Sequence, residues 1–282
     1  MEKTAIKGIP YGVANFEEVR SKNRYYVDKT MYLPLLEEVS DYLFLIRPRR
    51  FGKSVFVSMM QAYYDIAKAD RFDTLFDGLW IQEHPTPLKN AFQMIYFDFS
   101  IVGTGIGNLE EKFNEYCCIV MDSFIDTYQS FYRKEFCDAV LATSNAGTKM
   151  KLVNDEAHKL GYPLYLIIDE YDNFTNVILS EGGKEVFRNL THASGFYREY
   201  FKLFKAMFSR VFLIGVSPVT LDGLSSGYNI DWNISQDSDF NYMLGFSESD
   251  VREMFLYYKG VGKLRPDADI EAMLAEMKPW YN

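Results

Sequence analysis

The chain of 282 residues has few of the residues that build covalent or metal-bound frameworks. Its three cysteines are odd in number and form no C-x-x-C pair, so we expect buried thiols rather than disulfides. Its three histidines are widely spaced and show no zinc-site pattern. No apolar run approaches the roughly 18–20 residues that cross a bilayer, and no secretory signal is visible after Met1. We therefore expect a cytoplasmic protein with no membrane contact.

The charge balance excludes one class of protein. With 30 Lys+Arg against 39 Asp+Glu, the formal net charge is −9. This balance argues against a chain that coats nucleic acid by bulk charge, although it does not exclude a local basic patch. Hydrophobic residues make up 48% of the chain, which is enough for a globular core. The length fits one large domain or two small ones.

Short apolar runs alternate with helical patterns along the chain. The runs that we interpret as strands are 41–46, 93–100, 164–168, 211–215 and, as a short last strand, 242–246. Helical patterns cover 53–67, 108–136, 149–160, 184–208, 247–258 and 267–278, the last ended by Pro279. Alternating strands and helices predict an α/β fold, with a mostly parallel sheet covered on both faces.

The turn after the first strand carries a phosphate-binding motif. Residues 47–54 read Arg-Pro-Arg-Arg-Phe-Gly-Lys-Ser and match the P-loop pattern G-x-x-x-x-G-K-[ST], except that Arg47 replaces the first glycine. Lys53 would supply charge to the β- and γ-phosphates, and Ser54 a hydroxyl ligand to Mg²⁺. The alternative is an ordinary basic turn. The predicted nucleotide-binding residues are Arg49, Arg50, Phe51, Gly52, Lys53, Ser54 and Val55.

An acidic pair ends the most apolar strand pattern. Asp169 and Glu170 directly follow the run 164–168, at the carboxyl end of a strand, where ligands bind in open α/β sheets. Asp169 can hold Mg²⁺ there through water, and Glu170 can act as general base on an attacking water. The alternative is a solvated acidic pair. Together with the P-loop motif, the pair predicts nucleotide binding.

A further strand pattern leads to Ser217. We predict that Ser217, or in second place Thr220, senses the γ-phosphate, whereas the alternative is a serine that only begins a turn before Pro218. We interpret the run 94–100 as a strand inserted between the P-loop strand and the acidic strand. An inserted strand favours the additional-strand type of P-loop ATPase over the GTPase and kinase types, in which those two strands are neighbours.

These strings resemble the signatures of the AAA-ATPase-like family, a bacterial group of predicted P-loop ATPases. The resemblance rests on residues 47–54, Leu166-Ile-Ile-Asp-Glu-Tyr-Asp172 and Gly215-Val-Ser-Pro218, and it extends over nearly the whole chain. Arg47 at the first P-loop position is normal for that family, whereas Asn173-Phe174 departs from its pattern. The resemblance implies a three-layer α/β/α P-loop fold that binds ATP and Mg²⁺.

The resemblance also implies a division of the chain. Residues 1–245 would form the AAA-ATPase-like core, and 246–282 a small helical lid or the start of a C-terminal region. The family's usual companion is a C-terminal restriction-type nuclease-like domain. Because the chain ends at Asn282, in a segment like the start of the family's Trp-Tyr-Asn-Gly-Tyr, we expect a truncated chain without that domain. Nucleic acid would be contacted mainly through that absent domain, and a homo-oligomer is a second expected association.

The predicted function is ATP binding with Mg²⁺-dependent hydrolysis. Lys53 holds phosphates, Ser54 and Asp169 fix Mg²⁺, Glu170 orients water, and Ser217 senses the γ-phosphate. One alternative is a nucleotide-gated interaction module, or switch, with negligible turnover alone.

Another alternative is direct DNA binding through Arg47, Arg49 and Arg50, of which the last two would otherwise contact the γ-phosphate or form structural ion pairs. Lesser candidates are the following: Asp98 on the phosphate side of the sheet, Arg198 and Arg210 as arginine fingers, and Phe16, Tyr25 and Tyr26 near the base, with core packing as the other interpretation of these aromatics.

Overall fold

A parallel β-sheet forms the centre of the molecule. The computed structural model describes residues 5–102, 108–191, 196–217 and 232–281. Within these residues the sheet is five-stranded, in the order β2-β3-β4-β1-β5, and its neighbouring strands pair in parallel. Its strands are β1 (Tyr42–Ile46), β2 (Gln93–Asp98), β3 (Leu164–Asp169), β4 (Arg210–Gly215) and β5 (Trp232–Asn233). The α/β class and the parallel sheet are therefore confirmed.

The sheet order corrects one expectation about the strands. The strand that lies between β1 and β3 is β4, whereas β2, expected there from the run 94–100, pairs with β3 at the edge. An apolar run predicts a buried strand, but it does not predict the neighbours of that strand. Helical crossovers allow strands distant in sequence to pair.

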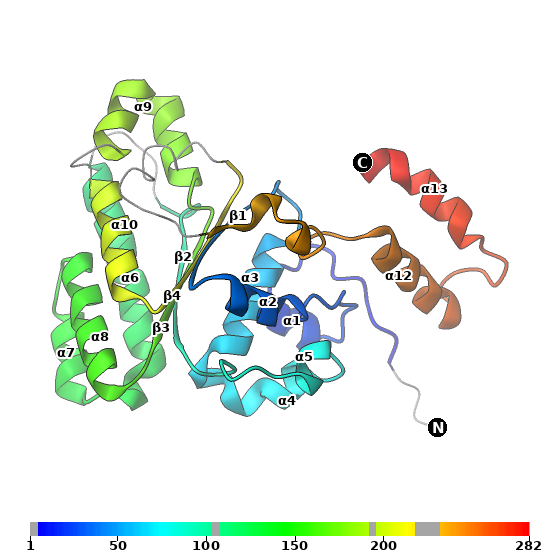
Figure 1. Cartoon of the computed structure of the whole chain (residues 1–282), viewed down its shortest axis with the longest axis horizontal. Coiled ribbons are helices and arrows are strands. Elements are labelled where there is room, and N and C mark those ends of the chain that lie inside the picture. The colour runs from blue at the N-terminus through cyan, green and yellow to red at the C-terminus, as the bar shows by residue number, and fades with distance from the viewer. Residues whose placement is uncertain (1–4, 103–107, 192–195, 218–231, 282) are drawn as a thin grey trace.

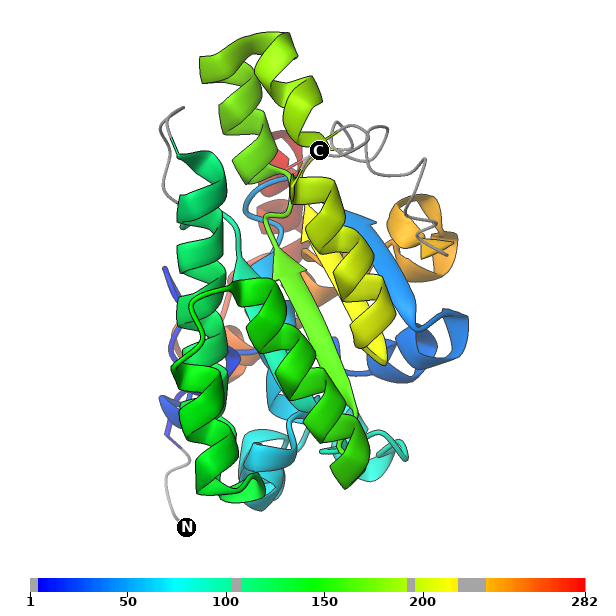
Figure 2. The ribbon, with the colours of Figure 1, turned by 90° about the vertical axis from the view of Figure 1, so that its left-hand side faces the viewer.

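Helices cover both faces of the sheet, as Figures 1 and 2 show. One face carries α6 (Leu109–Tyr128), α7 (Lys134–Leu141), α8 (Ala146–Leu160) and α10 (Phe196–Met207), while α9 (Asn173–Thr191) lies beyond the carboxyl ends of the strands. The other face carries α1 (Phe16–Ser21), α2 (Tyr32–Val39), α3 (Lys53–Tyr64), α4 (Phe72–Leu75) and α5 (Trp80–Glu83). The arrangement has three layers, α/β/α.

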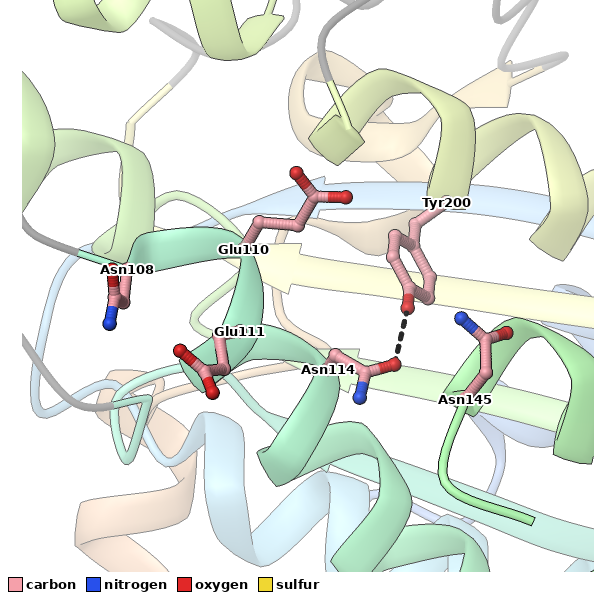
Figure 3. Close-up of a pocket in the computed structure, with 6 residues that line it drawn as sticks. All are labelled: Asn108, Glu110, Glu111, Asn114, Asn145 and Tyr200. Atoms are coloured by element: carbon pink, nitrogen blue, oxygen red, sulfur yellow. Dashed lines mark hydrogen bonds between the residues drawn. The ribbon is translucent and has the colours of Figure 1, made fainter.

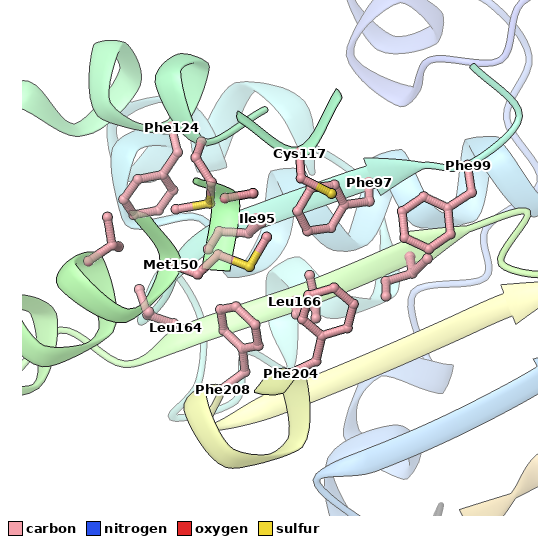
Figure 4. Close-up of a cluster of buried hydrophobic side chains, with 14 of the residues drawn as sticks. Ile95, Phe97, Phe99, Cys117, Phe124, Met150, Leu164, Leu166, Phe204 and Phe208 are labelled. Atoms are coloured by element: carbon pink, nitrogen blue, oxygen red, sulfur yellow. The ribbon is translucent and has the colours of Figure 1, made fainter. Parts of the chain in front are cut away.

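Each face of the sheet has its own hydrophobic core. Side chains alternate along a strand, so Leu166 and Ile168 of β3 enter one core while Tyr165 and Ile167 enter the other. Figure 4 shows the first core, in which Phe97 of β2 and Phe204 of α10 pack beside Leu166. Among the described residues, neither core contains a residue after Leu244.

Several helix boundaries differ from the expected ones. The stretch 108–136 divides into α6 and, after a 3-10 turn, α7. The helix α9 begins at Asn173 instead of near 184, because Phe174 and Ile178 are buried at helical spacing, and Gly183 (φ +76°) forms a kink inside it. Pro279 lies in the last turn of α13 (Ile270–Tyr281) and does not end it.

The expected last strand, 242–246, is an irregular segment. Gly245 has a φ of +77°, which a regular strand does not allow. Met243 and Leu244 are both buried, whereas Tyr242 and Phe246 are exposed, so burial does not alternate as it would in a half-buried strand. The apolar letters alone therefore predicted the wrong conformation.

A helical pair follows this segment. The predicted capping box is confirmed: Ser247 and Asp250 bond reciprocally at the start of α12 (Glu248–Gly260), and α13 packs against α12. Figure 1 shows the pair apart from the sheet, beside the N-terminal segment. The hydroxyl of Tyr257 accepts from Lys7 N–H at 2.8 Å, and Lys29 pairs with Asp250 at 2.8 Å. In the described part of the chain, no helix is both long and apolar enough for a membrane span.

Candidate functional site

Residues from the P-loop motif and the acidic pair meet at the carboxyl end of the sheet. The loop 47–52 follows β1, and Lys53 and Ser54 begin α3. The Nζ of Lys53 lies 3.2 Å from Oε1 of Glu170, and the hydroxyl of Ser54 lies 3.3 Å from Oδ2 of Asp169. Residues that the sequence separates by more than a hundred positions thus form one cluster.

The loop before α3 ends in a left-handed backbone turn at Gly52. Gly52 has a φ of +83°, a conformation that favours glycine. Among the described residues other than Gly52 and its two chain neighbours, no heavy atom lies within 4 Å of the place where a Gly52 Cβ would stand. The side chain of Lys53 is 5% exposed, and its ammonium also donates to the carbonyl of Arg47 at 3.3 Å. A helix N-terminus, an open backbone turn and a buried ammonium therefore converge.

Arg47 anchors the loop to a later part of the chain. Its guanidinium donates to the carbonyls of Ile46 (2.9 Å), Ser235 (2.7 Å) and Phe240 (3.3 Å). Burial lowers the pKa of Arg47. The backbone N–H of Arg47 donates to the carbonyl of Gly215 at 3.0 Å, which ties the loop to the end of β4. An arginine at this motif position therefore has a structural role that a glycine would not fill.

The remaining loop residues face outwards. Arg49 and Arg50 are exposed, and within the described chain neither guanidinium has an ion-pair partner. Arg50 has a φ of +69°, which is uncommon for a residue with a side chain. The carbonyl of Phe51 accepts from the Gly245 N–H at 2.9 Å, and Val55 is partly buried in the first turn of α3. The exposed arginines leave positive charge available at the mouth of the loop.

Asp169 is a buried carboxylate with few compensating charges. It is 2% exposed, and its Oδ1 accepts the N–H of Glu170 at 2.9 Å. Burial, with repulsion from Glu170 and Asp98, raises its pKa to about 6, against smaller opposing effects that include Lys53. Asp98 lies directly opposite in the β2–β3 register, so this lesser candidate does lie beside the site. The hydroxyl of Tyr96 lies 3.5 Å from Oδ2 of Asp169.

Glu170 adopts an unusual backbone conformation. Its φ is +51°, in the left-handed region that residues with a Cβ rarely occupy. Such conformations cluster at functional sites, where the surroundings hold them in place. Here the residue with this conformation forms the ion pair with Lys53.

Ser217 follows β4 and is held by the loop after β3. Its N–H donates to Oδ2 of Asp172 at 2.7 Å, and the hydroxyl of Tyr171 donates to its carbonyl. The sequence did not single out Tyr96, Tyr171 or Asp172. Their roles depend on which strands are neighbours, although Tyr171 and Asp172 lie inside the acidic motif itself. Thr220, the second sensor candidate, lies outside the described residues.

The lesser candidates have other surroundings. Arg210 pairs with Asp41 at 2.8 Å at the amino end of β4, the end opposite the site. Arg198 lies in the first turn of α10. Phe16 is fully buried and packs on Tyr26, and Tyr25 packs on the rings of α12. Core packing, the alternative for these aromatics, is therefore what the structure shows for Phe16 and Tyr26, whereas Tyr25 packs on α12 outside the two cores.

A separate hollow of about 420 Å³ lies at the start of α6 (Figure 3). Its lining carries two carboxylates, and the Tyr200 hydroxyl donates to Oδ1 of Asn114 at 3.3 Å. The lining residues are Asn108, Glu110, Glu111, Asn114, Asn145 and Tyr200. Because its charge is negative, this hollow does not suit a polyphosphate.

Comparisons with known proteins show which family the chain belongs to. The chain is 27% identical over 295 aligned positions to an "Uncharacterized protein in vnfD 5'region" of Azotobacter chroococcum mcd 1, an alignment that covers 98% of this chain and 48% of the relative. The chain thus spans about half the length of that protein. No solved structure matches the chain. A family model described as "Predicted AAA-ATPase" matches residues 10–225, which include the loop, the acidic pair and Ser217, and the chain therefore belongs to this family.

Proposed function

We propose that the protein binds ATP with Mg²⁺ at the end of the sheet and hydrolyses it. The observation that carries the proposal is the meeting of two motifs in space. Lys53 contacts Glu170 and Ser54 contacts Asp169, so the phosphate-binding and acidic residues share one site. Membership of a family of predicted ATPases supports the same conclusion.

The phosphate side of the site fits a polyphosphate. Lys53 is buried, and its ammonium donates to the Arg47 carbonyl at the start of the loop. The helix α3 begins at the same residue, with no side-chain cap on its first N–H groups in the described structure. Arg49 and Arg50 add exposed positive charge at the mouth. These groups would bind the β- and γ-phosphates of a nucleotide, in a chain whose net charge is otherwise negative.

The acidic side fits Mg²⁺. Ser54 and Asp169 would hold the ion, because the nearby positive charge of Lys53 only partly compensates the buried carboxylate of Asp169. Within the described residues, no group of three or more His, Cys, Asp or Glu side chains could hold a metal ion alone. This fits Mg²⁺, which commonly takes one or two protein ligands and completes its shell with phosphate oxygens and water. Bound Mg²⁺ would neutralise phosphate charge.

Glu170 and Ser217 complete the proposed site. Glu170 is 22% exposed and reaches Lys53, so it can orient a water beside the phosphates as general base. Ser217 lies on the neighbouring loop and would sense the γ-phosphate. The position of β4 between β1 and β3 supports the additional-strand type of ATPase. Residues 246–282, which lie outside both cores in the described structure, would act as the lid of a core formed by 1–245.

The test measures nucleotide binding and phosphate release on purified protein. We expect Lys53→Ala to lose nucleotide binding, because no other buried cation lies in the loop among the described residues. We expect Glu170→Gln to keep ATP binding and lose hydrolysis. Exposed Lys151→Ala on α8 is the matched control and should change neither. Undiminished hydrolysis in Glu170→Gln would remove that residue from the proposed role.

The nucleotide-gated switch is the second candidate function. The Lys53–Glu170 ion pair favours the switch. While the two side chains are paired, Lys53 would be less available to phosphate and Glu170 less available as a general base. Calorimetric titration beside a phosphate-release assay separates the two functions, since binding without release favours the switch. Homo-oligomerisation, and contact with nucleic acid through a further domain, stay predictions.

A further inference from the structure

Asp172 is a buried carboxylate that the proposed chemistry does not use. It is 1% exposed and lies two residues after Glu170. Its carboxylate accepts two consecutive backbone N–H groups, from Val216 at 3.1 Å and Ser217 at 2.7 Å. It also accepts the side-chain amide of Asn176 at 3.0 Å. Three donors satisfy this charge, and two of them belong to the loop after the neighbouring strand.

The main chain of Ser217 is held on both sides. Asp172 accepts its N–H, and the hydroxyl of Tyr171 donates to its carbonyl. Tyr171 and Asp172, two successive residues of the loop after β3, therefore fix both the N–H and the carbonyl of Ser217 in the loop after β4. A hydrogen bond to a carboxylate is stronger than one between neutral groups, so the contact from Asp172 is the dominant one.

The packing around these bonds leaves little room for rearrangement. A Cβ built on Gly215 would collide with the Tyr171 ring and the Asp172 carboxylate, so the close approach of the two loops requires glycine there. The Tyr171 ring packs edge-on against Phe44 of β1, with centroids 5.0 Å apart. Tyr197 of α10 donates to the Tyr171 carbonyl at 2.6 Å. The acidic loop is thus fixed from the β1 side and from the helical layer.

We propose that Asp172 is a positioning residue that fixes Ser217 relative to Glu170, so that the loops after β3 and β4 act as one unit. The inference rests on the proposed function for its catalytic consequence. The coupling of the two loops does not depend on the proposed function, because it follows from the hydrogen bonds of Asp172 and Tyr171. Tyr171 supports the same coupling through its hydroxyl.

The coupling itself is tested by amide hydrogen exchange, whether or not the protein turns over. In Asp172→Asn the side-chain NH₂ faces N–H donors in place of one carboxylate oxygen. We expect the amides of Val216 and Ser217 to exchange about tenfold faster, the effect of losing one hydrogen bond. The amides of β3 should exchange at the wild-type rate. Asp155→Asn, an exposed change on α8, is the matched control and should leave all of them unchanged.

The catalytic consequence is tested by a double-mutant cycle. We expect Asp172→Asn to lower kcat about 100-fold through misplacement of Ser217, with KM and ADP affinity kept within about twofold. Because Asp172 acts through Ser217, the same substitution in a Ser217→Ala background should lower kcat no further. Tyr171→Phe, which keeps the ring packing, should shift kcat in the same direction by a smaller factor.

Each outcome decides between positioning and a merely structural role. Unchanged protection of Val216 and Ser217 in Asp172→Asn would overturn the inference. So would an equal loss of kcat in the Ser217→Ala background, or a parallel loss of ADP affinity and kcat. If Asp172→Asn does not fold, amide exchange and kcat are both measured on Tyr171→Phe instead. If the wild-type protein releases no more phosphate than Lys53→Ala, hydrolysis fails and the exchange comparison alone decides the coupling.

Discussion

At the scale of one residue, the buried charge of Asp169 lowers the stability of the folded protein at neutral pH. Its carboxylate is buried beside Glu170 and Asp98, and its pKa is raised from 3.8 to about 6. The folded chain therefore binds this proton more tightly than the unfolded chain does. The stability that this proton contributes is present at pH values below about 4 and is lost as the pH rises through about 6.

This cost predicts a stabilising substitution at the site. Asp169→Asn removes the buried charge, while its amide oxygen can still accept the Glu170 N–H. We expect the free energy of unfolding to rise at pH 7.5 by up to about 3 kcal/mol, the equivalent of a two-unit shift. The gain should vanish at pH 4, and Mg²⁺-dependent nucleotide binding should be lost. Urea denaturation at both pH values measures the gain, and an equal gain at pH 4 would contradict its electrostatic origin.

Individual residues differ in how far the sequence predicted them. The chemistry of Gly52, Lys53 and Ser54 depends on one local turn, so a local motif was sufficient to place them. For Arg47 the sequence indicated a departure from the motif and a candidate DNA contact, but not its structural role, because two of the carbonyls that it binds belong to residues 235 and 240. Asp172 was missed for the same reason, since two of its three partners lie in the loop after another strand.

At the scale of elements, apolar runs predicted the strands that are buried on both faces, but they did not predict every helix boundary or the order of the strands. The strands β1, β3 and β4 were predicted because their residues are buried on both sides, as parallel strands are. The start of α9 was missed, because its buried positions are spaced along a mostly polar segment. The place of β4 between β1 and β3 was also missed, because pairing is decided by crossover connections that leave no local signal.

The start of α12 offers a test at this scale. Ser247 accepts the Asp250 N–H at 3.1 Å, and Asp250 also pairs with Lys29 of the N-terminal segment. We expect Ser247→Ala to destabilise the first turn of α12 by about 1 kcal/mol, because one helix N–H loses its acceptor. Faster amide exchange confined to that turn is the expected readout. Exposed Ser130→Ala is the control, and an equal effect there would contradict the role of the cap.

At the scale of the molecule, a negative total charge coexists with a positive loop. The net charge of −9 is a property of the whole surface, whereas Lys53, Arg49 and Arg50 gather at one end of the sheet. Bulk acidity therefore weighs against broad binding of nucleic acid, but it does not oppose one polyphosphate held at close range.

Nucleotide binding should raise the melting temperature of the whole protein. At a ligand concentration of about 100 times Kd, binding stabilises the folded state by about 2.7 kcal/mol, which for a chain of this size shifts Tm by roughly 5 °C. We expect this shift with ATP and Mg²⁺, and no shift for Lys53→Ala. Differential scanning calorimetry measures the shift in Tm. An equal shift in Lys53→Ala would show that the nucleotide binds at a site other than the one that contains Lys53.

The contacts between the N-terminal segment and α12 also determine the order of folding. Lys7 contacts Tyr257 across 250 positions of sequence, and Lys29 contacts Asp250 across 221. Closing such long loops is slow, and during synthesis α12 leaves the ribosome after all five strands of the sheet. The sheet and the phosphate loop can therefore assemble while α12 is still absent. In refolding, docking of α12 onto the N-terminal segment should be the final phase, later than the burial of β1 and β3.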